Sequence, residues 1–136
     1  MKANQFSVEM MEGKGCTANV LMIHNNTLIC ANAGDSRCIL GEGGKAVAMS
    51  HDHKPQLKRE RERIYKAGST VNIEGRIDGN LNLSRAIGDI AHKKNPRVAL
   101  QDQAITAMPD IKTHPITNKT DFALIGCDGI FETKTN

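Results

Sequence analysis

Residues 122–132 read FALIGCDGIFE, and the rest of the chain is organised around this segment. Residues 122–127 are an unbroken run of apolar and small residues, which is typical of a β-strand that is covered on both faces. The run stops at Asp128-Gly129, where glycine permits a sharp turn or a close approach to an ion. A carboxylate at the end of a buried strand is costly unless it is paired. Asp128 is therefore expected either to cap a following turn or helix or to bind a metal ion.

The composition is that of one globular domain. The chain has 136 residues, of which 39% are hydrophobic and 24% are charged, and this excludes a disordered chain. The formal net charge of +3 is too small to indicate nucleic acid or a membrane as a partner. The one basic cluster, residues 54–66, also contains Glu60 and Glu62. It is predicted to be a solvated helix face rather than a phosphate-binding patch.

Nothing in the sequence indicates export or membrane insertion. Residues 1–15 lack the apolar core of a signal peptide, and no stretch reaches the length that crosses a bilayer. The four cysteines, at positions 16, 30, 38 and 127, form no C-x-x-C pair and are predicted to be reduced, mostly buried thiols rather than zinc ligands. The five histidines are predicted to lie at the surface. We therefore expect an intracellular, cytoplasmic protein.

Alternating apolar runs and turn residues predict an α+β fold. Strands are predicted at residues 17–23, 28–33, 37–40 and 45–49, joined as an antiparallel meander. A helix is expected from Asp52-His53-Lys54-Pro55 to Gly68, with a narrow apolar stripe that covers one face of the sheet. The stripe consists of Leu57, Ile64, Tyr65 and Ala67. A short hairpin or flap is predicted at residues 71–79, and further strands at residues 104–108 and 111–115.

Three acidic turns follow strand-like runs, namely Gly34-Asp35, Gly88-Asp89 and Asp128-Gly129. One such turn is ordinary turn chemistry, but three of them raise the prospect that carboxylates converge at one edge of a sheet. Magnesium and manganese prefer such hard oxygen ligands, and a water that bridges two of these ions suits phosphate ester hydrolysis. Spacing alone leaves both interpretations open.

Five motifs occur in a characteristic order: ANAGDSRCIL, HDHKP, NLNLSRAIGD, AITAMPDI and FALIGCDGIFE. Together they resemble the metal-dependent protein serine/threonine phosphatases of the 2C type, and the match covers about residues 15–132. The resemblance implies two antiparallel sheets packed face to face with helices outside them, so that this chain forms a partial four-layer α-β-β-α sandwich with a flanking helix. It divides the chain into an N-terminal loop or edge segment, residues 1–14, and a partial phosphatase domain, residues 15–136.

The resemblance also implies an activity and a site. In this family two magnesium or manganese ions activate a bridging water, which hydrolyses phosphoserine or phosphothreonine in a phosphoprotein substrate. Asp128 matches a ligand of the core metal pair, and Asp35 matches a ligand of a third, weaker metal. Glu132 stands where the family has aspartate, so its role as a ligand is weaker. The substrate flap corresponds to residues 68–79 and includes Gly68, Gly75, Arg76 and Gly79.

Two further motif segments are expected to act structurally. Ser84-Arg85 and Gly88-Asp89 fall in the segment that supports the sheet and the flap in the family. Arg37 is expected to be a partner of the Asp35 turn rather than a contact to substrate.

The sequence also departs from the family pattern. It lacks the acidic D-G-H-G-G-like segment, the phosphate-gripping N-terminal arginine and the final D-N pair. We therefore predict that this chain alone is not an active phosphatase, has no certain catalytic residue and binds metal weakly or not at all. Three explanations stay open: part of a longer enzyme, a non-catalytic scaffolding subunit (a pseudophosphatase), or a truncated domain that binds a phosphorylated partner. A protein partner is expected to cover exposed sheet edges.

Overall fold

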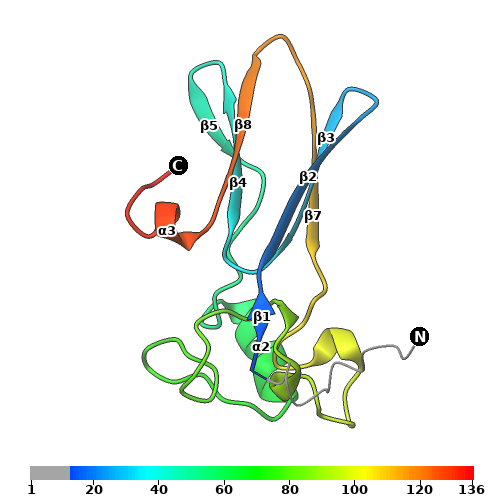
Figure 1. Ribbon diagram of the computed structural model, residues 1–136, viewed down its shortest axis with the longest axis vertical. Helices are drawn as coiled ribbons and strands as arrows, with labels where there is room; N and C mark the ends of the chain where they lie inside the picture. The colour runs from blue at the N-terminus through cyan, green and yellow to red at the C-terminus, as the bar shows by residue number, and fades with distance from the viewer. Residues whose placement is uncertain (1–12) are drawn as a thin grey trace, which may run out of the picture.

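The computed structural model describes residues 13–136, which form an α+β fold with two three-stranded sheets (Figure 1). Every strand pair within these sheets is antiparallel. The first sheet has the order β2-β3-β7, with strands Ala18–His24, Thr27–Ala33 and Asp110–Pro115. The second has the order β5-β4-β8, with strands Lys45–Ala48, Arg37–Glu42 and Thr120–Gly126. The α+β class with packed antiparallel sheets is confirmed. Most of the segment expected at residues 1–14 lies outside the described residues.

Tight turns set the register of the two local hairpins. Asn25 and Asn26 have φ angles of 45° and 59°, so they form the two-residue turn between β2 and β3 that the sequence predicts. Gly43 and Gly44 turn the chain between β4 and β5 in the same way. The predicted single meander is wrong, because the bend at residues 34–36 carries the chain from the first sheet into the second. β3 then takes β7 as its other neighbour.

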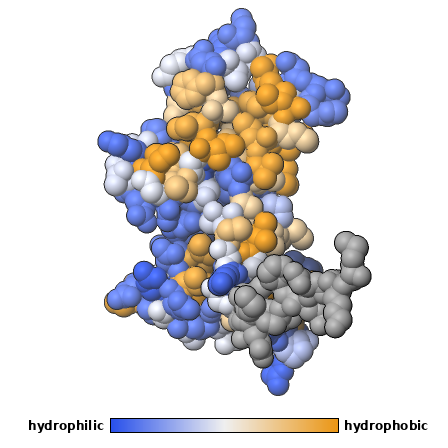
Figure 2. Space-filling model, viewed as in Figure 1, coloured by the Kyte–Doolittle hydropathy of each residue, from blue (hydrophilic) through white to orange (hydrophobic). Residues whose placement is uncertain are grey.

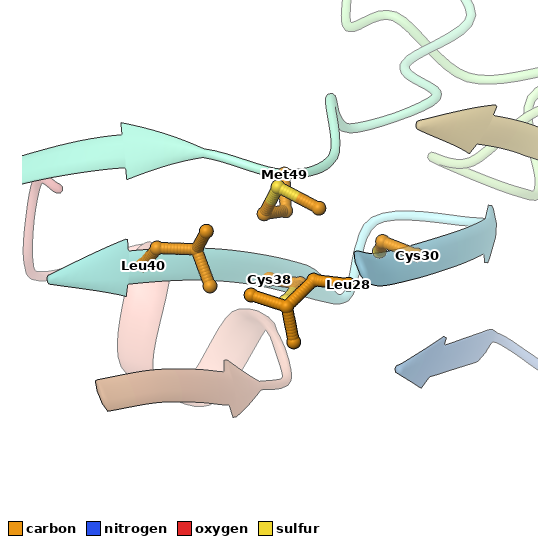
Figure 3. Packing of buried hydrophobic residues seen from close by; sticks show 5 residues of the cluster. All are labelled: Leu28, Cys30, Cys38, Leu40 and Met49. Carbon is orange, nitrogen blue, oxygen red and sulfur yellow. The ribbon is translucent and has the colours of Figure 1, made fainter. Parts of the chain in front are cut away.

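The two sheets pack face to face through aliphatic and sulfur-containing side chains. Leu28 and Cys30 of β3 meet Cys38 and Leu40 of β4, and Met49 closes the cluster (Figure 3). Burial, together with the neighbouring Cys30, raises the pKa of the Cys38 thiol to about 12, so that it stays protonated. The prediction of reduced, buried cysteines holds for this pair, whereas Cys16 and Cys127 are exposed.

The sandwich is closed on one side and open on the other. On the closed side, Lys112 of β7 donates to the carbonyl of Ala48, and His114 lies 3.1 Å from Glu42 of β4. On the open side, β2 and β8 are edge strands, and their inner-face residues Ile23 and Ile125 are 67% and 43% exposed. Figure 2 shows apolar side chains gathered over the half of the molecule that holds these sheets.

The strand β8 is less covered than its sequence predicts. Phe122 and Leu124 on its outer face are 60% and 41% exposed. The expectation of cover on both faces is wrong for the described residues, because the one described helix on the outer side of β8, α3, packs only against its Gly126 end and leaves Phe122 and Leu124 uncovered.

The helix α2 (Lys58–Lys66) lies at one end of the sandwich rather than over a sheet face (Figure 1). Gly68 follows it with a φ angle of 86°, which fits the predicted helix end. Ile64 of α2 is fully buried with Ile77, Ala86 and Ile105 in a second core cluster. Leu57 and Tyr65 are about half exposed, so the predicted apolar stripe is only partly buried and the expected covering role of the helix is wrong.

Short elements complete the described fold. They are β1 (Gly15–Cys16), which pairs with β6 (Ile87–Gly88), the 3-10 turns η1 (Ile90–His92) and η2 (Leu100–Asp102), and α3 (Asp128–Phe131). Residues 104–108 are buried in part but form only one isolated bridge, Arg85 to Thr106, instead of the predicted strand. No helix within residues 13–136 has the length and apolarity needed to cross a membrane.

Gly41 offers a test of the packing on the outer face of β4. The ring of Phe122 lies directly over this glycine, and a Cβ atom added there would lie 2.4 Å from Phe122 Cε1. We expect Gly41→Ala to lower the free energy of unfolding by about 1–3 kcal/mol, because the ring must be displaced. In denaturant titrations the double variant G41A/F122A should lose less than the sum of the two single variants. Strict additivity would contradict the contact.

Candidate functional site

Asp35, a predicted metal ligand, lies in the bend between β3 and β4 and is almost completely buried (3% exposed). The ammonium group of Lys54 forms an ion pair with its Oδ2 atom. This pairing offsets the cost of placing a carboxylate inside the protein. No role is predicted for Lys54 from the sequence alone, although its position in the HDHKP motif is a signal that marks it.

Two hydrogen bonds between His53 and Gly34, together called the His53 clamp, bring Lys54 to this position. The His53 amide donates to the Gly34 carbonyl at 3.0 Å, and the Gly34 amide donates to His53 Nδ1 at 3.1 Å. Because Nδ1 accepts a hydrogen bond, the ring proton lies on Nε2, which donates to Asp110 Oδ2 at 3.2 Å. Burial and the charge of Arg85 lower the pKa of His53 despite the hydrogen bond to Asp110. The predicted surface location is wrong for this histidine, because its ring satisfies the backbone of the bend.

Asp128 begins the short helix α3, and the N-cap position belongs to Cys127. The helix expected after this aspartate is present, but no side-chain capping hydrogen bond is made. Among the described residues the half-buried carboxylate of Asp128 has no hydrogen-bond or ion-pair partner, so it is free to take a ligand. Glu132 is exposed one helical turn later, and its amide donates to the Asp128 carbonyl at 2.8 Å.

The three acidic turns do not meet in one metal-binding group. Within residues 13–136 no three His, Cys, Asp or Glu side chains lie close enough together to hold an ion. Asp35 is neutralised by Lys54, and Asp89 is buried beside Gly15 of β1. The donor set of the described residues therefore fits one metal ligand, Asp128, and does not fit a site for two ions.

Arg37 connects β4 to the segment that carries Asp128. Its Nε and Nη2 atoms donate to the two carboxylate oxygens of Asp52 at 2.9 and 3.0 Å. The guanidinium group lies 4.6 Å from the ring centre of Phe131 in α3, and Nη1 donates to Asn136 at 2.8 Å. Arg37 thus holds α3 against the sandwich by a cation–π contact and by hydrogen bonds.

A buried ionic network lies beneath the His53 clamp. Glu60 of α2 is 2.5 Å from Arg85 and 2.6 Å from Arg63, and it accepts a hydrogen bond from the Ser84 hydroxyl at 2.7 Å. Burial alone would raise the pKa of Glu60, but these donors outweigh it and lower the pKa to about 2. The predicted solvated helix face is therefore wrong at Glu60, because two arginines pair with it inside the protein.

Arg85 carries the network onward to β7. It donates to Asp110 Oδ1 at 2.8 Å and to the Met108 carbonyl at 3.0 Å. Burial would raise the pKa of Asp110, but hydrogen bonds from Arg85 and His53 lower it to about 2. These contacts fit the structural role that is predicted for the Ser84-Arg85 segment.

The predicted flap is an irregular loop after α2. Gly75 and Gly79 adopt left-handed φ angles of 76° and 75°, and Arg76 donates to the Asn80 carbonyl at 2.7 Å. Ile77 anchors the loop in the second core cluster, whereas Ile73 is fully exposed at its tip. The role of these residues in substrate choice stays a prediction.

An open pocket of about 690 Å³ lies between α2 and residues 97–108. Its charged lining is mostly basic and consists of five basic side chains and two acidic ones: Arg59, Arg63, Lys66, Arg85, Arg97, Glu62 and Asp102. That the basic cluster is not a phosphate-binding patch stays a prediction.

The described residues form part of a sandwich of two antiparallel sheets with acidic residues at strand ends. The sequence profile described as Protein phosphatase 2C matches residues 2–136. The chain is 51% identical over 119 residues to "Probable protein phosphatase 2C 6" of Paramecium tetraurelia, covering 88% of this chain and 40% of that protein. It is 48% identical over 134 residues to "Protein phosphatase 1G" of Rattus norvegicus, covering 93% of this chain and 25% of that protein. The chain belongs to the protein phosphatase 2C family.

Solved structures agree with this assignment. A phosphatase from a pathogenic strain of Toxoplasma gondii has a TM-score of 0.71 and 38% identity, covering 78% of this chain and 32% of that one. A C. elegans sex determining protein has a TM-score of 0.77 and 27% identity, covering 88% and 28%. The chain therefore spans less than half the length of each of these relatives and neighbours.

Acid titration tests the buried network. Because the pKa of Glu60 is lower in the folded than in the unfolded chain, the unfolded chain binds the proton first. The ionised Glu60 carboxylate therefore contributes about 3 kcal/mol to the free energy of unfolding. This contribution is complete above about pH 5 and is lost as the pH falls toward 2. We expect Glu60→Gln to lower the free energy of unfolding at pH 7 and to reduce the change of this free energy with pH between pH 5 and 3. Glu62→Gln, on the exposed face of the same helix, is the control, and equal slopes in E60Q and wild type would contradict the pairing.

Hydrogen exchange tests the contact between Arg37 and α3. Arg37→Lys keeps the charge but loses the two-pronged hydrogen bond and the broad stacking surface. We expect the amides of Ile130 to Lys134 to open more easily by about 1 kcal/mol, with the strands unaffected. Arg61→Lys on α2 serves as the matched control. Unchanged exchange in R37K would show that α3 is held by other contacts.

Proposed function

We propose that this chain is the part of a magnesium- or manganese-dependent protein serine/threonine phosphatase that contributes Asp128 as a metal ligand. The observation that supports the proposal is the unpaired carboxylate of Asp128 at the end of β8, in the segment that resembles the core metal motif of the family. A carboxylate that is half-buried yet unpartnered is the arrangement that gains most from a cation. The substrate class is a protein that carries phosphoserine or phosphothreonine.

The ligand count limits what these residues do alone. One carboxylate and water bind a divalent ion weakly, because affinity rises with the number and charge of the ligands. Two-metal hydrolysis requires further acidic ligands, and none joins Asp128 in a group within residues 13–136. We therefore infer that the 136-residue chain by itself does not turn over a phosphorylated substrate, and that the other ligands come from elsewhere. Glu132 is an auxiliary ligand on the same short helix, and Asp35 is one only if Lys54 leaves it.

A non-catalytic scaffolding role is the second candidate, and the open side of the sandwich favours it. Ile23 and Ile125 expose apolar area that a protein surface or another strand would cover. In this role the sandwich contributes surface rather than chemistry. Metal binding at Asp128 separates the two candidates, because only the phosphatase role requires it.

Manganese binding tests the role of Asp128. Electron paramagnetic resonance of free Mn²⁺ should show weak binding to the chain, with Kd on the order of millimolar, and Asp128→Asn should abolish it. Asp121→Asn, an exposed aspartate of β8, should leave binding unchanged. In parallel, the chain should hydrolyse a phosphothreonine peptide no faster than buffer with Mn²⁺. Mn²⁺ binding that survives D128N would overturn the ligand assignment, and turnover that D128N abolishes would overturn the inference of inactivity.

A further inference from the structure

We propose that Lys54 is an internal cation that occupies the position of a metal at Asp35, and that a divalent ion binds Asp35 only when Lys54 is displaced. The proposal starts from one ion pair: Lys54 Nζ meets Asp35 Oδ2, and the two side chains are 27% and 4% exposed. It deepens the proposed function, because it concerns an auxiliary ligand of that site. It does not depend on whether Asp128 binds metal.

The lysine is delivered by a fixed backbone. His53, its neighbour, is hydrogen bonded in both directions to Gly34, the neighbour of Asp35. The carbonyl of His53 also accepts from both the amide and the hydroxyl of Ser84, each at 2.9 Å. Because the two backbones are tied together beside the ion pair, only the flexible stem of Lys54 has to be ordered. The loss of side-chain entropy that weakens most lysine ion pairs is therefore small here.

The charge balance explains why the lysine excludes the metal. Asp35 is the one carboxylate in this pair, and the ammonium group already compensates its charge in a poorly hydrated place. A divalent ion would have to shed water, displace the ammonium and then rely on a single carboxylate. With Lys54 present the exchange is unfavourable. A neutral side chain at position 54 leaves the buried carboxylate without a cation, and the site then gains affinity for a divalent ion.

The experiment uses the full chain in a D128N background, so that Asp128 cannot contribute to metal binding. Mn²⁺ binding is measured by electron paramagnetic resonance, and stability by thermal unfolding with and without Mn²⁺. We expect Lys54→Met to destabilise the metal-free chain, to bind Mn²⁺ at least about tenfold more tightly than any residual binding by the D128N parent, and to gain stability from Mn²⁺. Adding Asp35→Asn to K54M should restore stability and remove the response to Mn²⁺. Lys58→Met, an exposed lysine four residues away, should behave like the parent.

Several outcomes would overturn the proposal. The first is that the D128N chain binds Mn²⁺ with Lys54 intact, that D35N removes this binding, and that K54M does not strengthen it. Another is a K54M chain that stays unfolded at millimolar Mn²⁺ while the D35N/K54M chain folds, because a divalent ion then fails to replace the ammonium. Loss of all Mn²⁺ binding in the Asp128-intact chain would contradict the proposed function instead, so the two failures are distinguishable.

Discussion

The buried carboxylate of Glu60 is the constraint on which the rest of the structure depends. It sits between Arg85 and Arg63 with both partners within 2.6 Å, and the Glu60–Arg85 pair is almost free of solvent contact. Replacing such a pair with apolar residues can be neutral, but removing one partner leaves a buried charge uncompensated. No buried side-chain nitrogen or oxygen in the described part of the chain lacks a partner. The network therefore admits essentially one arrangement of α2 against the sandwich.

This arrangement extends to the candidate site through a series of direct contacts. Arg85 pairs with Asp110 on β7, Asp110 accepts from His53, and His53 clamps the Gly34 bend. The position of Asp35 is thus coupled to α2 through Arg85, Asp110 and His53. A second support, Arg37 with Asp52 and Phe131, fixes α3 independently. The two aspartates that resemble metal ligands are consequently held by separate sets of contacts and differ in environment: one is neutralised, the other is free.

The turns and the helix end that depend on neighbouring residues could be predicted from the sequence. The Asn25-Asn26 turn and the end of α2 at Gly68 depend on backbone preferences that the sequence states directly. The burial of Glu60 depends on Arg85, which is 25 residues away, so charge alternation along the helix could not reveal it. The apolar run of β8 predicted a strand correctly but not its neighbours. A run of hydrophobic residues indicates that other elements should pack over both faces of the strand. Within the described residues nothing packs over Phe122 closely enough to bury it.

The same distinction applies to the acidic turns. A carboxylate at the end of a strand needs a cation or several donors, and a sequence motif states that need without stating what meets it. The motif order correctly indicated the family, and with it the position of Asp35. It could not show that the ammonium group of Lys54 reaches the Asp35 carboxylate, because this contact depends on the hydrogen bonds between His53 and Gly34. A lysine and a divalent ion satisfy the same buried charge, but only the ion requires further acidic ligands. The number of carboxylates that meet at one point, rather than the presence of any one aspartate, therefore decides whether such a site binds metal.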